Sequence, residues 1–149
     1  MKKKIIIVSG RICTWKSALA QRISDEYGFE LIKTSDILRK MTSSQLTRSE
    51  LQEYGDRLDV STNFRWVHDA VESATKSETA SDTFILDHVR HKGQLEYFRS
   101  QSDLDVTHIH LFAQNWFLEA EFKNRQRESP ETVSGTWYEA DPLFGQQED

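Results

Sequence analysis

The segment from Lys4 to Tyr27 constrains the fold more than any other part of this chain. Residues 4–9 are rich in β-branched side chains, which is typical of a buried parallel strand, and residues 17–27 place apolar side chains at helical spacing. Residues 10–17 between them read Gly-Arg-Ile-Cys-Thr-Trp-Lys-Ser. Gly28 follows the predicted helix, where a left-handed C-terminal cap belongs. A strand, a turn that begins with glycine and a helix in this order predict an α/β fold.

The turn fits the pattern G-x-x-x-x-G-K-[ST] at Gly10, Lys16 and Ser17, but Trp15 stands in place of the second glycine. In loops of this pattern, backbone N–H groups surround a phosphate, the lysine reaches the β- and γ-phosphates, and the hydroxyl ligates Mg²⁺. Lys16 and Ser17 also open the predicted helix, where a phosphate would meet the positive end of the helix dipole. We therefore predict a P-loop whose ATP-binding residues are Gly10, Thr14, Trp15, Lys16 and Ser17.

Trp15 leaves two interpretations of this degraded Walker A motif open. The second glycine normally lets the backbone approach phosphate in a conformation that disfavours a Cβ atom. An indole at this position either fills the phosphate site or forces the loop to rearrange. The chain is then either an enzyme impaired by Trp15 or a catalytically silent nucleotide-fold module that acts in binding or regulation.

Length and charge exclude several functional classes. A chain of 149 residues suits one domain, 1–149, with a sizeable core. The net charge of -5 and the pI of about 5.5, without a long basic stripe, disfavour a nucleic-acid-binding protein. The single cysteine excludes an internal disulfide, and no segment is long enough to span a bilayer. We expect a cytoplasmic domain that binds neither nucleic acid nor membranes, and the oligomeric state stays open.

The remaining pattern alternates strands with helices. We predict strands over residues 29–34, 83–87 and 107–113, and helices over 35–39, 49–58, 64–75, 94–100 and 116–127. Ser35 is the predicted cap of the first of these helices, and Ser49 with Gln52 forms a predicted capping box for the next. This order predicts a three-layer α/β fold, in which helices cover both faces of a parallel sheet and ligands bind at the carboxyl ends of the strands.

Three further segments carry polar residues just after a predicted strand or in a late helix. They are Thr34-Ser35-Asp36-Ile37-Leu38-Arg39, then Asp87-His88-Val89-Arg90, and then the segment of Arg125 and Arg127. Together with residues 10–17, they resemble the P-loop nucleoside and nucleotide kinases of the adenylate-kinase and deoxynucleoside-monophosphate-kinase type. The resemblance covers most of the chain. It implies a P-loop NTPase fold, an acceptor-binding helical insert at about residues 35–78 and a short lid at about residues 119–140.

The resemblance also implies roles for individual acceptor-site residues. Arg39 would bind the acceptor phosphate, with Ser35 and Asp36 lining the acceptor site, because a guanidinium matches phosphate bidentately. Asn63-Phe64-Arg65-Trp66 is similar to a Gly-Arg-Trp-like stretch in some of these kinases, so Arg65 is a further acceptor-binding candidate. Arg90 is another, because Asp87-His88-Val89-Arg90 is similar to an Asp-Gly-x-Arg-like segment of the family, with His88 in place of the small residue. As alternatives, Arg39 is a solvated residue of a last helical turn, and Trp66 packs in the core.

The implied catalytic residues are Lys16, Asp87, Arg125 and Arg127. Asp87 ends an apolar strand, so it would join Ser17 at the metal, whereas the alternative is a simple turn cap. Arg125 and Arg127 would neutralise the transferring phosphoryl group, although nearby glutamates equally suit a solvated helix of mixed charge. Ser134-Gly135-Thr136-Trp137-Tyr138 and Asp141-Pro142 would form the far side of the lid.

The function that the resemblance implies is transfer of the ATP γ-phosphoryl group, with Mg²⁺, to a (deoxy)nucleoside monophosphate. Another small acceptor, such as a cofactor precursor, fits the same frame. His108 and His110 lie on one strand face by alternation and are expected to be structural, because no further metal ligands can be placed beside them.

Overall fold

The computed structural model describes residues 2–43, 45–76, 81–130 and 133. Four strands and six helices alternate within this part of the chain. In order they are β1 (Lys3–Gly10), α1 (Lys16–Tyr27), β2 (Glu30–Lys33), α2 (Thr34–Thr42), α3 (Arg48–Thr62), α4 (Trp66–Ala74), β3 (Thr83–Asp87), α5 (Lys92–Ser100), β4 (Leu104–Leu111) and α6 (Asn115–Glu128).

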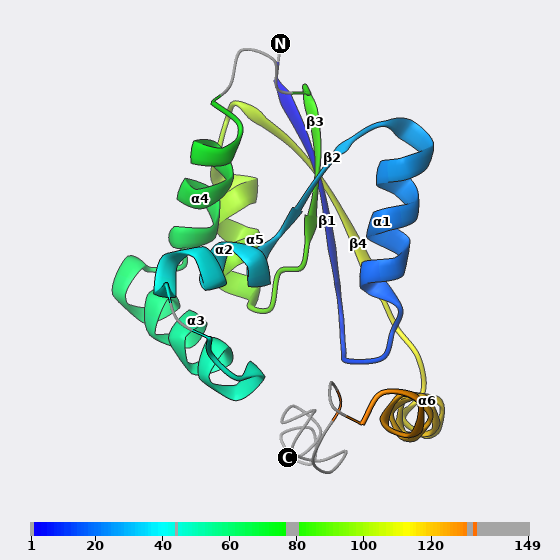
Figure 1. The fold of residues 1–149 in the computed structure, drawn as a ribbon. Helices are drawn as coiled ribbons and strands as arrows, with labels where there is room; N and C mark the ends of the chain where they lie inside the picture. Colours follow the sequence, from blue (N-terminus) through cyan, green and yellow to red (C-terminus); the bar gives the residue numbers. More distant parts are fainter. Residues whose placement is uncertain (1, 44, 77–80, 131–132, 134–149) are drawn as a thin grey trace, which may run out of the picture.

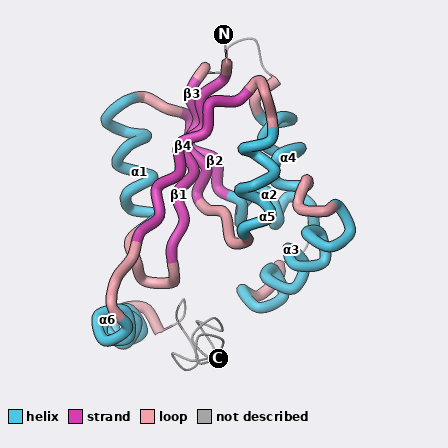
Figure 2. The backbone as a smooth tube through the Cα atoms, turned by 180° about the vertical axis from the view of Figure 1, so that it is seen from behind, coloured by secondary structure: helices cyan, strands magenta, loops and turns pink. Residues whose placement is uncertain are grey.

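The four strands form one parallel sheet in the order β2-β3-β1-β4. Helix α1 lies on one side of this sheet and helices α2 to α5 lie on the other, as both views show (Figures 1 and 2). In the register, Val8 pairs with Asp87 and Gly10 pairs with Leu111. The loop after β1 and the end of β3 therefore lie side by side, and the three-layer arrangement predicted from the sequence is confirmed.

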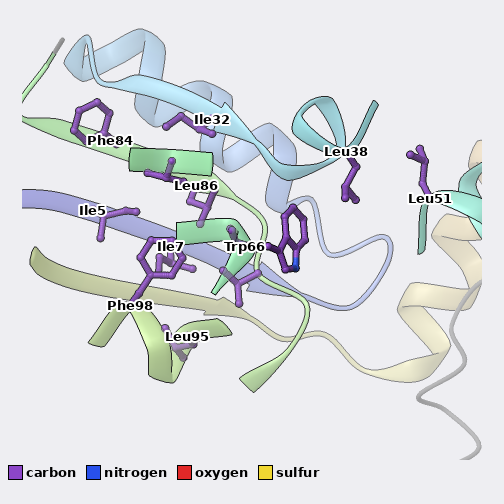
Figure 3. Close-up of a cluster of buried hydrophobic side chains, with 13 residues drawn as sticks. Ile5, Ile7, Ile32, Leu38, Leu51, Trp66, Phe84, Leu86, Leu95 and Phe98 are labelled. Atoms are coloured by element: carbon purple, nitrogen blue, oxygen red, sulfur yellow. The ribbon is translucent and has the colours of Figure 1, made fainter. Parts of the chain in front are cut away.

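The larger part of the core fills the space between the sheet and helices α2 to α5 (Figure 3). Alternate residues of β1, such as Ile5 and Ile7, meet Trp66 and Phe98 from α4 and α5 in this cluster. Trp66 is 6% exposed, and its indole Nε1 donates a hydrogen bond of 2.7 Å to the buried Asp59 carboxylate. The interpretation of Trp66 as a core residue is confirmed, with a buried partner for its polar atom.

Two helix starts differ from the sequence prediction. Helix α2 begins at Thr34 after Lys33, and no side chain caps it, so the predicted cap at Ser35 is wrong. Helix α3 is capped by Thr47 and Glu50, whereas the prediction named Ser49 and Gln52. Thr47 is extended and its hydroxyl accepts from the Glu50 amide, so the cap lies two residues earlier than predicted and the helix begins at Arg48.

Helix α6 lies beyond the carboxyl ends of β1 and β4, next to the loop that follows β1 (Figure 1). It covers the first part of the predicted lid at residues 119–140, whereas the segments 134–138 and 141–142 lie outside the described residues. Among the helices that the structure describes, none is both long enough and apolar enough to cross a membrane.

Candidate functional site

The loop after β1 begins at a glycine that no other residue could replace without distortion. Gly10 has a φ of +151°, and a Cβ atom there would lie 2.7 Å from both the Leu111 carbonyl oxygen and the Thr14 hydroxyl. The loop then closes on the Arg11 carbonyl oxygen, which accepts from the Thr14 hydroxyl at 2.8 Å and from Lys16 Nζ at 3.1 Å. The lysine ammonium is therefore folded back over the loop, at the start of α1.

Trp15 adopts the left-handed backbone that a glycine would normally provide, with φ 64° and ψ 21°. Its side chain is 54% exposed, and the Arg125 guanidinium lies over the indole at 5.1 Å from the ring centroid. Cys13 is also left-handed, with φ 64°. The indole is thus held in a left-handed backbone beside Arg125, and whether it fills the phosphate site stays a prediction.

A cavity of about 240 Å³ opens beside this loop. Its lining residues are Cys13, Trp15, Lys16, Ser17, Ala18 and Arg125. Three of them were predicted to bind ATP, and Arg125 was predicted to act from the lid. Helix α6 holds this arrangement in two ways, since Arg11 donates to the Asn115 side chain and Cys13 packs against Leu118 and Phe122.

Asp87 is the buried acid of the site. It is 6% exposed, and within the described part of the chain its Oδ1 atom has no hydrogen-bond partner. Burial lowers the pKa of Lys16, and the negative charge of Asp87 acts in the opposite direction. A buried carboxylate oxygen that lacks a donor, close to a lysine and the N-terminus of α1, fits a ligand or water-mediated ligand of Mg²⁺.

Two residues beside this group, Arg48 and His88, were not among the predicted site residues. Burial, followed by the charges of Lys16, Arg90 and Arg48, lowers the pKa of His88 to about 3, so this imidazole is neutral at pH 7. The pKa of Arg48 is lowered by desolvation and then by Arg90 and Arg125, although its side chain keeps solvent exposure. Arg48 directly follows the Thr47 cap. The capping-box pattern of Thr47 and Glu50 is the sequence signal that places Arg48 at the start of a helix.

Arg90 is held near this group by a buried hydrogen-bond network. Its backbone N–H donates to Gln94 Oε1 at 3.1 Å, and Gln94 in turn donates to Asp59 Oδ1 at 2.7 Å. The same Asp59 oxygen accepts from Trp66. The Arg90 guanidinium is half-exposed and lies 3.4 Å from Asp56 Oδ1 on α3. The network fixes the backbone, while the guanidinium remains accessible from solvent.

Comparison with known proteins agrees with this geometry. The family model described as an AAA domain matches residues 16–133, from the P-loop lysine to the end of the described part of the chain. The chain belongs to the AAA domain family. A search of curated protein sequences finds no match.

Two solved structures are similar to this AAA domain. A presumed kinase from Chloroflexus aurantiacus J-10-fl superposes with a TM-score of 0.59 at 13% identity, covering 87% of this chain and 71% of that protein. A gluconokinase from Sinorhizobium meliloti 1021 superposes with a TM-score of 0.46 at 14% identity, covering 89% of this chain and 76% of that protein. The first similarity shows that the AAA domain shares its three-layer α/β P-loop fold with that protein.

Four predicted site residues of this AAA domain do not line the cavity beside the P-loop, namely Ser35, Asp36, Arg39 and Arg127. Arg39 and Asp36 form an exposed ion pair of 3.2 Å on α2, with the half-buried Ser35 beside them in sequence. Arg127 donates to the side chain of Asn124 at 3.4 Å and is exposed.

Arg65 is directed away from the P-loop. Its Nε donates to both carboxylate oxygens of Asp69 at 2.9 and 3.0 Å, and both residues line a second cavity, which contains Lys3 and Ile5 from the start of β1. That surrounding gives no support to the acceptor-binding role, which for Arg65 stays a prediction.

Proposed function

We propose that this AAA domain is an ATP-dependent phosphotransferase of the nucleotide-kinase type, which transfers the γ-phosphoryl group to a (deoxy)nucleoside monophosphate or a similar small anionic acceptor. The observation that carries this proposal is the group of Lys16, Arg48, Arg90 and Arg125 around the buried Asp87 and the neutral His88. Phosphoryl transfer requires cations placed around several phosphates and no covalent nucleophile.

On the donor side, Lys16 and the amides of residues 10–17 would hold the ATP phosphates. Arg125 lines the cavity together with Lys16 and Ser17, which supports a role for it as the lid residue that would neutralise the transferring group. Ser17 and Asp87 would hold Mg²⁺, which would supply positive charge against the phosphates. The unpartnered Asp87 Oδ1 is the feature of the site that supports this assignment.

On the acceptor side, Arg90 and Arg48 are the residues whose positions best support binding of an acceptor phosphate. Arg90 extends from a backbone fixed by Gln94, and Arg48 lies within electrostatic reach of both Arg90 and Arg125. Arg39 would join them by releasing Asp36 and binding the acceptor phosphate. Its exposed ion pair with Asp36 contributes at most about 1 kcal/mol, so little free energy opposes this change of partner. The region of residues 35–78 contains α2, α3 and α4 and is the proposed acceptor-binding insert.

The test is ADP formation from Mg²⁺·ATP in the presence of each common nucleoside or deoxynucleoside monophosphate. We expect at least one acceptor to raise ADP formation above the rate with water alone, and we expect Lys16→Met to abolish that increase. Arg22→Met on the exposed face of α1 is the matched control, because it removes the same charge and should leave the rate unchanged. Equal rates with and without every acceptor would contradict the kinase proposal.

A catalytically silent binding module is the second candidate, and the loop geometry favours it in one respect. Cys13 and Trp15 are both non-glycine residues in the left-handed region, which L residues enter at a cost of about 1–2 kcal/mol each. Calorimetric titration with Mg²⁺·ATP separates the candidates. ATP binding without any phosphoryl transfer would indicate the silent module, and transfer to any acceptor would exclude it.

A further inference from the structure

The molecule has a second cavity at the end of the sheet opposite the P-loop. It has a volume of about 360 Å³ and is lined by the first residues of β1, β3 and β4 together with α4 and α5. Lys3, Phe84 and Leu104 contribute from the strands, whereas Gly10 and Asp87 mark the other ends of β1 and β3. The proposed phosphotransferase makes no use of this cavity.

Three potential metal ligands of α4 line the cavity on one side. His68, Asp69 and Glu72 each offer one ligand atom, and these atoms all lie within 4.8 Å of one another. His68 and Glu72 are four residues apart and so share one face of the helix. The distance from His68 Nδ1 to Asp69 Oδ1 is 3.6 Å. Two ligands of a tetrahedral zinc ion at Zn–N and Zn–O distances of about 2.0–2.1 Å lie about 3.3 Å apart, so this pair needs only a small adjustment.

The state of the His68 ring provides an independent indication. Its Nδ1 atom is buried, and within the described residues no donor or acceptor forms a hydrogen bond with it. A buried polar nitrogen without a partner costs free energy, and a lone pair in that state is the usual metal donor of a neutral imidazole. The ring is fixed from α5 by an edge contact with Tyr97 at 5.3 Å and by Phe98 at 5.5 Å.

Neighbouring side chains position the carboxylate ligand. Arg65 Nε binds both oxygens of Asp69, in the way that outer-sphere hydrogen bonds commonly orient a ligating carboxylate. Lys3 Nζ points to the carbonyl and hydroxyl oxygens of Thr75, at 3.4 and 3.5 Å, and so is engaged at the end of α4. Asp103 adds a further negative charge to the cavity lining.

We propose that His68, Asp69 and Glu72 form a binding site for a zinc-class divalent cation. One imidazole nitrogen with two carboxylate oxygens favours Zn²⁺, Co²⁺ or Ni²⁺ over Mg²⁺ and Ca²⁺, which prefer ligand sets made only of oxygen. The cavity beside the three ligands leaves room for a water molecule in the fourth position. The site is separate from the proposed Mg²⁺ position at Ser17 and Asp87.

The test is a titration of the full chain with Zn²⁺ in competition with a chromophoric chelator, followed by Co²⁺ binding monitored by visible absorption. We expect one equivalent of Zn²⁺ to bind the wild type, and we expect His68→Gln and Glu72→Gln each to weaken binding by at least about tenfold. Zn²⁺ should also raise the melting temperature of the wild type and have no such effect on either variant. Excess Mg²⁺ should not compete.

Two control variants test whether potential metal ligands elsewhere in the chain bind the ion instead. His110→Gln removes a histidine of β4, and Cys13→Ser removes the thiol of the P-loop, and both should bind Zn²⁺ as the wild type does. Glu72 is exposed, so its substitution tests the site even if His68→Gln is less stable. Undiminished binding by both α4 variants, loss of binding in either control variant, or no binding by the wild type, would overturn the proposal. None of these outcomes depends on phosphotransferase activity.

Discussion

At the scale of single residues, Trp15 has two opposing effects on stability. Its left-handed backbone costs about 1–2 kcal/mol. The contact of its half-exposed ring with Arg125 returns about 0.5–1 kcal/mol. The backbone cost is the larger effect, so we expect Trp15→Gly to raise the free energy of unfolding by up to about 1.5 kcal/mol. Urea denaturation measures this change.

The same substitution should increase the affinity for Mg²⁺·ATP, because it frees the cavity rim and lets the loop amides approach phosphate. Trp15→Ala is the control, since it removes the indole and keeps most of the backbone cost. If the alanine variant gains as much affinity as the glycine variant, the indole itself obstructs the nucleotide. A loss of affinity in both variants would mean that the indole contributes to binding, for example by stacking on the base.

His88 predicts a dependence of stability on acid pH. The pKa of its imidazole is near 6.5 in the unfolded chain and about 3 in the folded protein. Between these values the unfolded state binds the extra proton, so stability falls as the pH decreases from about 6.5 towards 3. The slope from this one group is at most about 1.4 kcal/mol per pH unit. Urea denaturation across this pH range should show it, and His88→Asn should reduce it.

A second histidine contributes to the same slope and serves for comparison. Burial and then the charges of Arg99 and His110 lower the pKa of His108, so His108→Asn should also flatten the profile. Since the ring of His108 is more accessible than that of His88, its effect should be the smaller one. An unchanged acid slope in His88→Asn would show that the imidazole is solvated in the folded protein.

At the scale of the elements, the capping box of α3 positions a proposed functional residue. The Thr47 hydroxyl accepts from the Glu50 amide, and Glu50 Oε2 accepts from the Thr47 N–H at 2.7 Å. We expect Thr47→Ala to cost about 1 kcal/mol of stability. It should also weaken acceptor binding, because Arg48 is the first residue of the helix. Ser49→Ala, two residues later in the first turn of α3, is the matched control. It should change neither the stability nor the free energy of acceptor binding by more than a few tenths of a kcal/mol.

The elements themselves were largely predictable, because periodicity is local information. The β-branched run before Gly10 and the helical spacing after it identify β1 and α1, and Gly28 ends α1 in the left-handed conformation as expected. Helix starts were less accurate. Both Thr47 and Ser49 satisfy the sequence rule for a cap, and only the backbone conformation at Thr47 decides between them.

At the scale of the whole molecule, the sequence could not predict which distant side chains meet. Asp59 binds both Trp66 and Gln94, although the second partner is 35 positions away. Ser9 likewise bonds to His108 and His110 from the neighbouring strand, at 2.7 and 2.8 Å. Such pairs are set by sheet order and helix packing.

The meeting of polar residues at the carboxyl edge of the sheet was predictable, since parallel strands bring these ends together. Asp87 and Lys16 were placed there from sequence. The orientation of a long side chain was not predictable. Arg65, which directly precedes α4, illustrates this, because Asp69 in the first turn of that helix binds its guanidinium beside the second cavity.

The charge distribution of the whole molecule leads to the last prediction. The chain carries a net charge of -5, yet Lys16, Arg48, Arg90 and Arg125 lie within electrostatic reach of one another or of His88. Like charges held together oppose folding until an anion compensates them. Inorganic triphosphate should therefore raise the melting temperature, and the increase should diminish with rising salt concentration, because salt screens these charges.

Single substitutions in this group should separate binding from stability. Lys16→Met and Arg48→Met should each weaken triphosphate binding by about tenfold or more, the value of a charge-assisted hydrogen bond. Arg48→Met should leave the unliganded protein as stable as the wild type or more stable, since one repulsive charge is removed. Lys16→Met should be the less stable of the two variants, because it also removes the hydrogen bond to the Arg11 carbonyl oxygen and a charge that attracts Asp87. Arg22→Met removes a charge that is exposed and lies 4.0 Å from Glu26, so it should affect neither quantity. If Arg22→Met weakens binding as much as Lys16→Met does, the net charge of the chain, and not this group of cations, attracts the phosphates.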